Sequence, residues 1–174
     1  IEDSQVYYDD TFYFNIPKKS KISVLAISDN TSSEFLKKIY SKDEFIFKSQ
    51  DFKALDFSQI KNTNLIVLNG VNDISIALKN SLKDFMTNGG ITVLIPGDQG
   101  NISSYNQLIS TQTIHSLKPI KSQEKSITDL EFDHFILKEV FKSKVTNFQY
   151  PSVNSYYPIT LSLIHISEPT RPNF

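Results

Sequence analysis

The chain has 174 residues, of which 39% are hydrophobic, enough for one packed domain or for one domain and part of another. Its formal net charge of -1 excludes the broadly basic surface that nucleic-acid binding requires. The lack of cysteine excludes thiol nucleophiles, disulfides and cysteine-ligated zinc sites. No apolar run approaches the length of a membrane span. The opening residues have neither an initiator methionine nor signal-peptide character, so we expect the natural start to lie upstream.

The first predicted element is a β-hairpin. Residues 5–16 contain two β-prone, aromatic-rich runs on either side of Asp9 and Asp10, a pair typical of a turn. We interpret residues 1–17 as the end of an upstream β domain. Residues 17–20 form a short polar segment typical of a boundary between structural elements, and we place the start of the next domain at residue 18.

A strand and a helix open this second region. Residues 22–27 form a nearly continuous apolar run, typical of a strand buried on both faces of a parallel sheet. Residues 31–34 have the spacing of a capping box and predict a helix start. Its apolar stripe is expected to comprise Phe35, Leu36, Ile39 and Tyr40. Residues 45–47 are a candidate second strand.

The same alternation then repeats. Residues 64–68 predict a third strand and residues 91–95 a fourth. Between them, Asp73 is expected to cap a helix that ends at Asn88-Gly89-Gly90, because glycine accepts the left-handed conformation of a helix C-terminus. The apolar positions of this helix are Ile74, Leu78, Leu82, Phe85 and Met86.

The pattern weakens beyond the fourth strand. Residues 104–109 predict a short helix, and residues 135–141 predict either a helix or a strand. Strands alternating with helices predict an α/β domain of flavodoxin-like type over residues 18–160, with a parallel sheet, flanking helices and right-handed crossovers.

Three polar loops follow predicted strands and supply the candidate ligand-binding residues. Ligands of open parallel sheets bind beyond the carboxyl ends of the strands. Asp29, Asp73 and Asp98 offer the oxygen ligands that a hard cation prefers. The alternative, which we favour, is that these loops are solvated turns and helix caps, where Asp and Asn are common. The full candidate set is Asp29, Asn30, Asn69, Asp73, Asp98 and Gln99.

The sequence contains no recognisable catalytic machinery. Residues 97–100 match neither of the glycine patterns that cradle phosphates, and His115 and His134 do not stand in a metal-ligand spacing. Asp133 is placed to orient the imidazole of His134 for base catalysis, but no nucleophile is identifiable, so we favour a surface histidine. We expect a non-enzymatic domain without a cofactor or a metal.

The succession of Asn69-Gly70, a helix, Asn88-Gly89-Gly90, a strand and Pro96-Gly97 resembles the class I glutamine amidotransferase-like fold. In active members of that family, the strand equivalent to residues 91–95 leads into a sharp elbow that bears cysteine. Pro96-Gly97-Asp98 takes that place here, so the resemblance implies the fold without the amidotransferase activity.

Four further segments resemble Bacteroidetes membrane proteins that have a BatA-type, aerotolerance-related N-terminal region. They are DTFYF at residues 10–14, NLIVLN at 64–69, SYNQL at 104–108 and VTNFQYP at 145–151. The resemblance implies paired membrane helices upstream, absent from this chain, and a periplasmic location for this region.

The last residues differ from the rest of the chain. The only arginine is Arg171, and residues 161–171 resemble the in-frame translation of a transposase-based sequencing adapter. We therefore expect residues 161–174 to be a non-native tail that contributes no core packing. The alternative is a genuine exposed C-terminal peptide.

Taken together, these observations favour a non-catalytic, extracytoplasmic interaction or sensing domain of a membrane-anchored bacterial protein. We expect a protein or cell-envelope partner and no nucleic acid, with membrane anchoring only through the upstream helices. Two alternatives stay open. One is a hydrolase-like enzyme whose site is assembled from distant loops, and the other is a purely structural spacer.

Overall fold

The computed structural model describes residues 20–29, 33–40, 43–113, 115–134, 137–138, 141 and 150–161. The hairpin predicted in residues 1–17, the candidate residue Asn30 and the tail beyond residue 161 lie outside these ranges. Of the segment predicted as a helix or a strand at 135–141, Leu137 and Lys138 form a turn.

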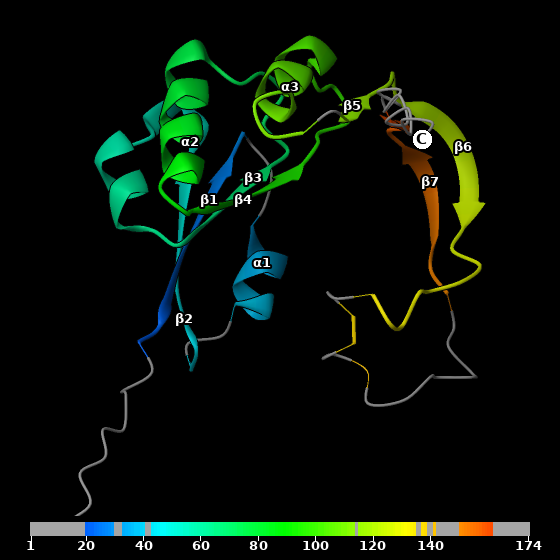
Figure 1. Cartoon of the computed structure of the whole chain (residues 1–174), viewed down its shortest axis with the longest axis horizontal. Coiled ribbons are helices and arrows are strands. Elements are labelled where there is room, and N and C mark those ends of the chain that lie inside the picture. The colour runs from blue at the N-terminus through cyan, green and yellow to red at the C-terminus, as the bar shows by residue number, and fades with distance from the viewer. Residues whose placement is uncertain are drawn as a thin grey trace, which may run out of the picture.

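A four-stranded parallel sheet organises the described residues, as predicted (Figure 1). The strand order β2-β1-β3-β4 is that of flavodoxin-like folds. Strands β1 and β3 lie in the centre, and their apolar runs are buried because both sheet faces there are covered. The strands are β1 (Ile22–Ser28), β2 (Phe45–Asp51), β3 (Leu65–Asn69) and β4 (Ile91–Ile95).

One face of the sheet holds the larger core. The helices α2 (Ile76–Thr87) and α3 (Ile102–Ile109) cover it, together with the 3-10 helices η1 (Phe52–Ala54) and η2 (Phe57–Asn62). Figure 1 shows α2 and α3 on one side of the sheet and α1 (Glu34–Ile39) on the other. The buried residues of this core are Leu25, Ile27, Ile60, Ile66, Leu68, Val71, Ile74, Leu78, Leu82, Phe85, Tyr105 and Leu108.

The opposite face, which we call the α1 face, is covered less completely. Its buried cluster consists of Val24, Ala26, Leu36 and Val67. Of the predicted apolar stripe of α1, only Leu36 is buried, whereas Phe35 is 46% exposed and Ile39 is 64% exposed. The prediction that the whole stripe is buried is therefore wrong. A helix of six residues has less than two turns, so few of its side chains face the sheet.

The start of α2 also differs from the prediction. Ser75, not Asp73, is the N-cap, and its Oγ accepts a hydrogen bond from the Leu78 N–H at 3.2 Å. Asp73 lies two residues too early, and Ile74 is buried before the helix begins. The predicted C-terminus is confirmed: Gly89 has φ of 89°, and the Gly90 N–H donates to the Phe85 carbonyl at 3.0 Å.

Two antiparallel pairs follow the sheet. The strand β5 (His115–Leu117) pairs with β8 (Ile159–Leu161), and β6 (Lys121–Ser126) pairs with β7 (Ser152–Tyr156). All six residues of β6 are exposed, so its sequence carries no apolar alternation from which a strand could be predicted. Figure 1 shows the β6–β7 ribbon to one side of the α/β layers.

Leu161, which the sequence assigns to the non-native tail, is the last residue of β8 and stands opposite His115. In the part of the chain that the structure describes, no helix has the length and apolar character needed to cross a bilayer.

Candidate functional site

The carboxyl ends of β1, β3 and β4 lie at one level of the sheet. Ser28 pairs with Asn69, and Asn69 pairs with Ile95, so the loops that follow these strands start side by side. This is the edge at which the sequence places its candidate residues. Asn30 lies outside the described residues, and the other five can be located.

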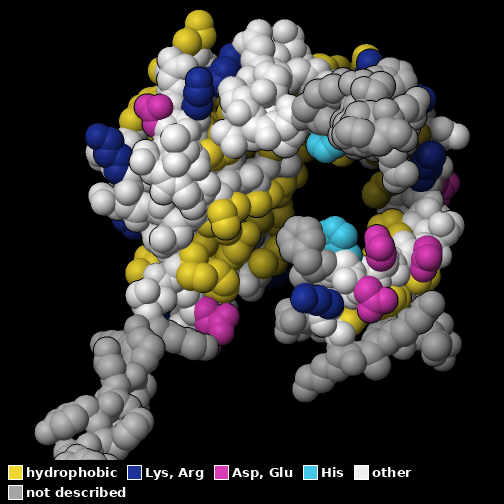
Figure 2. All heavy atoms as spheres, in the orientation of Figure 1, with side chains coloured by type: hydrophobic (Ala, Val, Ile, Leu, Met, Phe, Trp, Pro, Cys, Tyr) yellow, Lys and Arg dark blue, Asp and Glu magenta, His cyan; other side chains and the backbone are white. Residues whose placement is uncertain are grey.

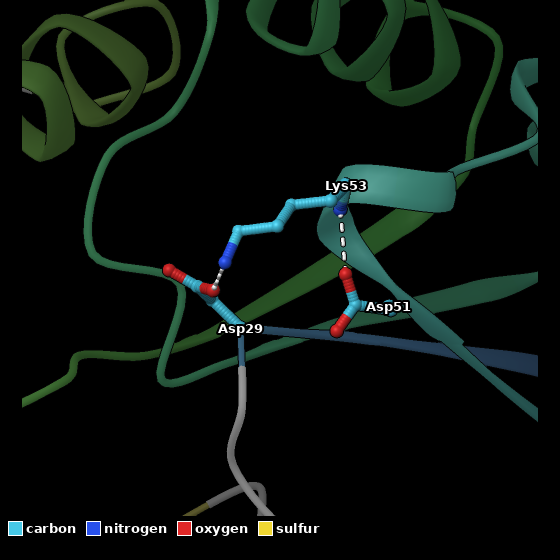
Figure 3. Close-up of polar contacts among 3 residues, drawn as sticks. All are labelled: Asp29, Asp51 and Lys53. Atoms are coloured by element: carbon cyan, nitrogen blue, oxygen red, sulfur yellow. Dashed lines mark hydrogen bonds and ion pairs between the residues drawn. The ribbon is translucent and has the colours of Figure 1, made fainter.

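Asp29 is tied to η1, the 3-10 helix that follows β2. Its carboxylate is 18% exposed and forms an ion pair of 3.5 Å with the Lys53 ammonium (Figure 3). The backbone N–H of Lys53 donates to Asp51 Oδ1 at 2.8 Å, which caps η1. Sequence reasoning missed Lys53 and Asp51 because it ended β2 at residue 47, four residues before its carboxyl end.

The loop after β3 is joined to the loop after β4. Asn69 is buried, and Gly70 takes the left-handed conformation with φ of 67°. The Gly70 N–H donates to the Ile95 carbonyl at 2.9 Å, and the Asn101 N–H donates to the Asn72 carbonyl at 2.6 Å.

Asp73, the residue predicted as a helix cap, lies exposed beside this junction. Its Oδ1 accepts a hydrogen bond of 3.3 Å from Asn101 Nδ2. Asn101 in turn caps α3, because its Oδ1 accepts from the Ser104 N–H at 3.2 Å. Asp73 therefore links the loop after β3 to the start of α3.

Gly97 stands at the position of the elbow. Its N–H donates to the Tyr105 hydroxyl at 3.1 Å, and its carbonyl accepts from the Tyr157 hydroxyl at 2.6 Å. The Tyr105 hydroxyl itself donates to the Val71 carbonyl at 2.7 Å. A Cβ at position 97 would lie 2.8 Å from Asn72 Oδ1 and 3.1 Å from the Gly70 carbonyl oxygen, so the close approach of the two loops favours glycine here.

Burial raises the pKa of the Tyr105 hydroxyl above its usual value, more than the hydrogen bond from Gly97 lowers it. Tyr105 is therefore neutral at physiological pH and acts as a hydrogen-bonding group. Asp98 and Gln99, the next candidates along the chain, are exposed at the tip of this loop.

The geometry lends no support to a cation at this edge. Among the residues that the structure describes, no three His, Asp or Glu side chains come together as metal ligands would. Asp29 is engaged by Lys53 and Asp73 by Asn101. The described candidates thus act as loop-fixing groups, or lie exposed in a turn.

The two candidate histidines belong to other segments than the three loops of this edge. His115 is half-buried in β5, opposite Leu161. His134 is exposed in a turn, where its backbone N–H donates to the Glu131 carbonyl at 3.0 Å.

Sequence reasoning missed a cavity at the opposite, amino end of the sheet. It has a volume of about 930 Å³ and is bounded by η2, the end of α2 and the starts of the four strands. Nothing in the sequence assigns a structure to residues 52–63, so the wall formed by η2 could not be anticipated. The lining mixes apolar residues such as Ile22, Phe57 and Ile91 with polar residues that are scattered along the sequence, so no motif marked the cavity.

The sequence matches no known protein-family profile, and no curated protein sequence is significantly similar to it. Among solved structures, a ThuA-like protein from Bacteroides uniformis ATCC 8492 shares the fold, with a TM-score of 0.56 and 14% sequence identity. The superposition covers 84% of this chain and 64% of that protein. At this identity the similarity shows the fold alone, and it agrees with the amidotransferase-like α/β architecture.

Proposed function

We propose that this domain is a non-catalytic interaction or sensing module of a membrane-anchored bacterial protein and that it faces the periplasm. Membrane anchoring and the periplasmic location rest on the resemblance of four sequence segments to BatA-type proteins. The non-catalytic role rests on the geometry around Gly97.

Enzymes whose nucleophile stands on a sharp turn after a strand need two features at that turn. They expose a nucleophile on a sharp turn, and they keep backbone N–H groups free to stabilise an oxyanion. In this chain Pro96 and Gly97 follow β4 directly and carry no nucleophile. The carboxylate of the next residue, Asp98, is exposed at the tip of the loop. The Gly97 N–H donates to the Tyr105 hydroxyl, and the Gly97 carbonyl accepts from the Tyr157 hydroxyl. Both backbone groups therefore form hydrogen bonds that stabilise the fold.

Two surfaces suit contact with a protein or cell-envelope partner. Asp73, Asp98 and Gln99 present exposed polar groups at the carboxyl edge. On the α1 face, exposed apolar side chains include Phe35, Ile39, Ile91 and Val93. Figure 2 shows hydrophobic side chains gathered over α1 and the adjoining strands. An apolar patch beside polar groups is typical of protein interaction surfaces.

A photocrosslinking experiment in native membranes tests the proposal. A photoreactive amino acid replaces Gln99 or Phe35 in the full-length membrane protein, and Lys83, exposed on α2, serves as the control position. We expect discrete crosslinked products from position 99 or 35 and none from position 83. Products that are equally absent at all three positions would favour the structural spacer.

The enzyme alternative has its own assay. The purified domain is incubated with glutamine and with generic ester substrates, and we expect no turnover above the uncatalysed rate. Turnover that is abolished by His134→Ala would overturn the non-catalytic role, because it would identify His134 as a base.

A further inference from the structure

The cavity at the amino end of the sheet brings buried and exposed apolar side chains together on one concave surface. Its volume of about 930 Å³ falls within the range of small-molecule pockets, roughly 300–1,000 Å³. Ile60 and Phe85 are buried lining residues, whereas Phe57 and Ile91 line the same cavity while being 40% and 62% exposed. A ligand that covers these exposed side chains therefore gains free energy from the apolar area that it removes from water.

Aromatic side chains dominate the apolar part of the lining. Phe45, Phe57 and Phe85 come from β2, η2 and α2, so three separate elements each contribute a ring. The Phe85 ring packs directly on the backbone of Gly90, where a Cβ would overlap it. Because packing already fixes this ring, a ligand that contacts it loses little affinity to the ordering of the side chain.

The polar groups of the lining fall into two sets. Some serve the fold: Asn64 Oδ1 accepts from the Ser23 N–H at 2.9 Å, and the Thr63 hydroxyl donates to the Gln59 carbonyl at 2.9 Å. Ser81 belongs to the other set, because its hydroxyl is half-buried in the wall formed by α2 and forms no hydrogen bond with the residues that the structure describes. Its hydroxyl is available to a ligand.

The charged residues of the lining are Lys21, Lys61 and Asp84, so the cavity carries a net positive charge. Lys61 is exposed in the last turn of η2. Within the described part of the chain, neither Lys61 nor Asp84 takes part in an ion pair. An ammonium group beside an apolar surface favours a ligand that carries a negative charge on an apolar body.

We propose that this cavity binds a small organic anion with an aromatic body, of the class of the aromatic carboxylates. The aromatic body covers Phe57 and Phe85, and the carboxylate pairs with Lys61. The cavity lies at the opposite end of the sheet from the polar loops, so this inference does not depend on the partner contact proposed above.

Isothermal titration calorimetry of the full chain tests the proposal with two probes of the same shape. The first is 2-naphthoate, and the second is 2-naphthalenemethanol, in which a neutral alcohol replaces the carboxylate. We expect 2-naphthoate to bind at one saturable site and the alcohol to bind about threefold more weakly, because a partly exposed ion pair adds only a modest gain.

Two charge variants should change the affinity for 2-naphthoate in opposite directions. Lys61→Gln should weaken binding about threefold, and Asp84→Asn should strengthen it about twofold by removing a like charge. Neither substitution should change binding of the neutral alcohol. Lys83→Gln is the matched control, since Lys83 is exposed on α2 but is not a lining residue, and it should leave both affinities unchanged.

A steric variant locates the site. Ser81→Trp places a large side chain in the cavity and should abolish binding of both probes, whereas Lys83→Trp places the same side chain on α2 outside the cavity and should have no effect. Circular dichroism checks that each variant keeps the α/β fold. The charge variants keep the test decisive if Ser81→Trp does not fold, because Lys61 and Asp84 are exposed.

Four results would overturn the inference. The first is that 2-naphthoate shows no saturable binding to the folded chain. The second is binding that survives in a folded Ser81→Trp variant. The third is equal affinity for the two probes with no response to Lys61→Gln, which would remove the anion from the proposal. The fourth is binding that is lost in Ile39→Gln, which would place the probe on the α1 face instead.

Discussion

The Tyr105 hydroxyl bridges two loops that are far apart in the sequence. It donates to the Val71 carbonyl after β3 and accepts from the Gly97 N–H after β4, and the side chain is fully buried. A buried backbone group that loses its partner bears the whole cost of desolvation. This side chain is therefore one of the groups that hold the two loops together at the carboxyl edge of the sheet.

We expect Tyr105→Phe to lower the free energy of unfolding by about 1–3 kcal/mol, because two backbone groups lose their partner while the ring still fills its site. Urea denaturation measures the change. Tyr157→Phe is the matched control, since it removes one hydroxyl bond, to Gly97, from a half-buried position, and its effect should be smaller. Equal losses in the two variants would contradict the bridging role of Tyr105.

The same hydroxyl predicts a pH dependence. Burial raises the pKa of Tyr105 above its usual 10.0, so the native state holds this proton more tightly than the unfolded chain. The contribution of Tyr105 is complete below pH 10.0 and is lost as the pH rises through the native pKa. Measured by urea denaturation, the stability difference between the unaltered protein and Tyr105→Phe should therefore narrow above pH 10.0; a constant difference would contradict it.

At the level of single elements, α2 shows which of two residues caps the N-terminus of a helix. Two oxygen-bearing residues, Asp73 and Ser75, precede the helix. Ile74 is drawn into the core, where its N–H donates to Ser104 Oγ at 2.8 Å. The helix then begins after Ser75, and Asp73 is left to the loop contact with Asn101.

Ser75→Ala should lower the free energy of unfolding by about 1 kcal/mol, because the Leu78 N–H loses its cap. Asp73→Ala should cost less, since this exposed residue makes a weak 3.3 Å contact. Thermal denaturation of both variants measures the two losses and shows whether Ser75 or Asp73 is the N-cap of α2. A larger loss for Asp73→Ala would reverse the assignment.

The helix α1 exposes two apolar side chains one turn apart, Phe35 and Ile39, beside the incompletely covered α1 face. Such a surface binds hydrophobic dyes. We expect Ile39→Gln to reduce fluorescence of the dye ANS with little change in stability. Ile76→Gln is the control: Ile76 is 74% exposed, but its neighbours at i+3 and i+4 are Lys79 and Asn80. Equal effects of the two substitutions would argue against a continuous patch.

For the whole molecule, β8 joins the last described residues to β5. Leu161 pairs with His115, and the Lys118 N–H donates to the Pro158 carbonyl at 2.8 Å. The sequence starts the expected non-native tail at residue 161, but Leu161 pairs in β8, so the cut is placed after it. Truncation after Leu161 should leave the melting temperature unchanged, because it removes only the rest of that expected tail. Truncation after Pro158 removes β8 and should lower the melting temperature, by about 2–4 °C for each kcal/mol lost. Differential scanning calorimetry compares the two, and a drop on the first truncation would make the tail part of the fold.

Some of this architecture could be predicted because the pattern of apolar residues in a short segment indicates which of its positions are buried. Strands β1 and β3 have short apolar runs, since parallel strands with two covered faces need apolar side chains throughout. The edge strand β4 has such a run as well, although Ile91 and Val93 are exposed. The Gly89 turn was predictable because few other residues accept a positive φ. In the candidate site, the sequence by itself determined that polar loops would meet at the carboxyl edge, because strand direction follows from the alternating pattern.

Other features depend on partners distant in the chain, which no local pattern encodes. The ion pair of Asp29 with Lys53 and the bridge from Tyr105 to Gly97 exist only after the strands have paired. The exposed strand β6 is defined by its pairing with β7, and the amino-end cavity by the meeting of η2, α2 and the sheet. The sequence thus determined the parallel sheet and its polar edge, through burial and backbone preference. Only the tertiary structure decided which groups fix that edge and where the cavity opens, because both are products of long-range packing.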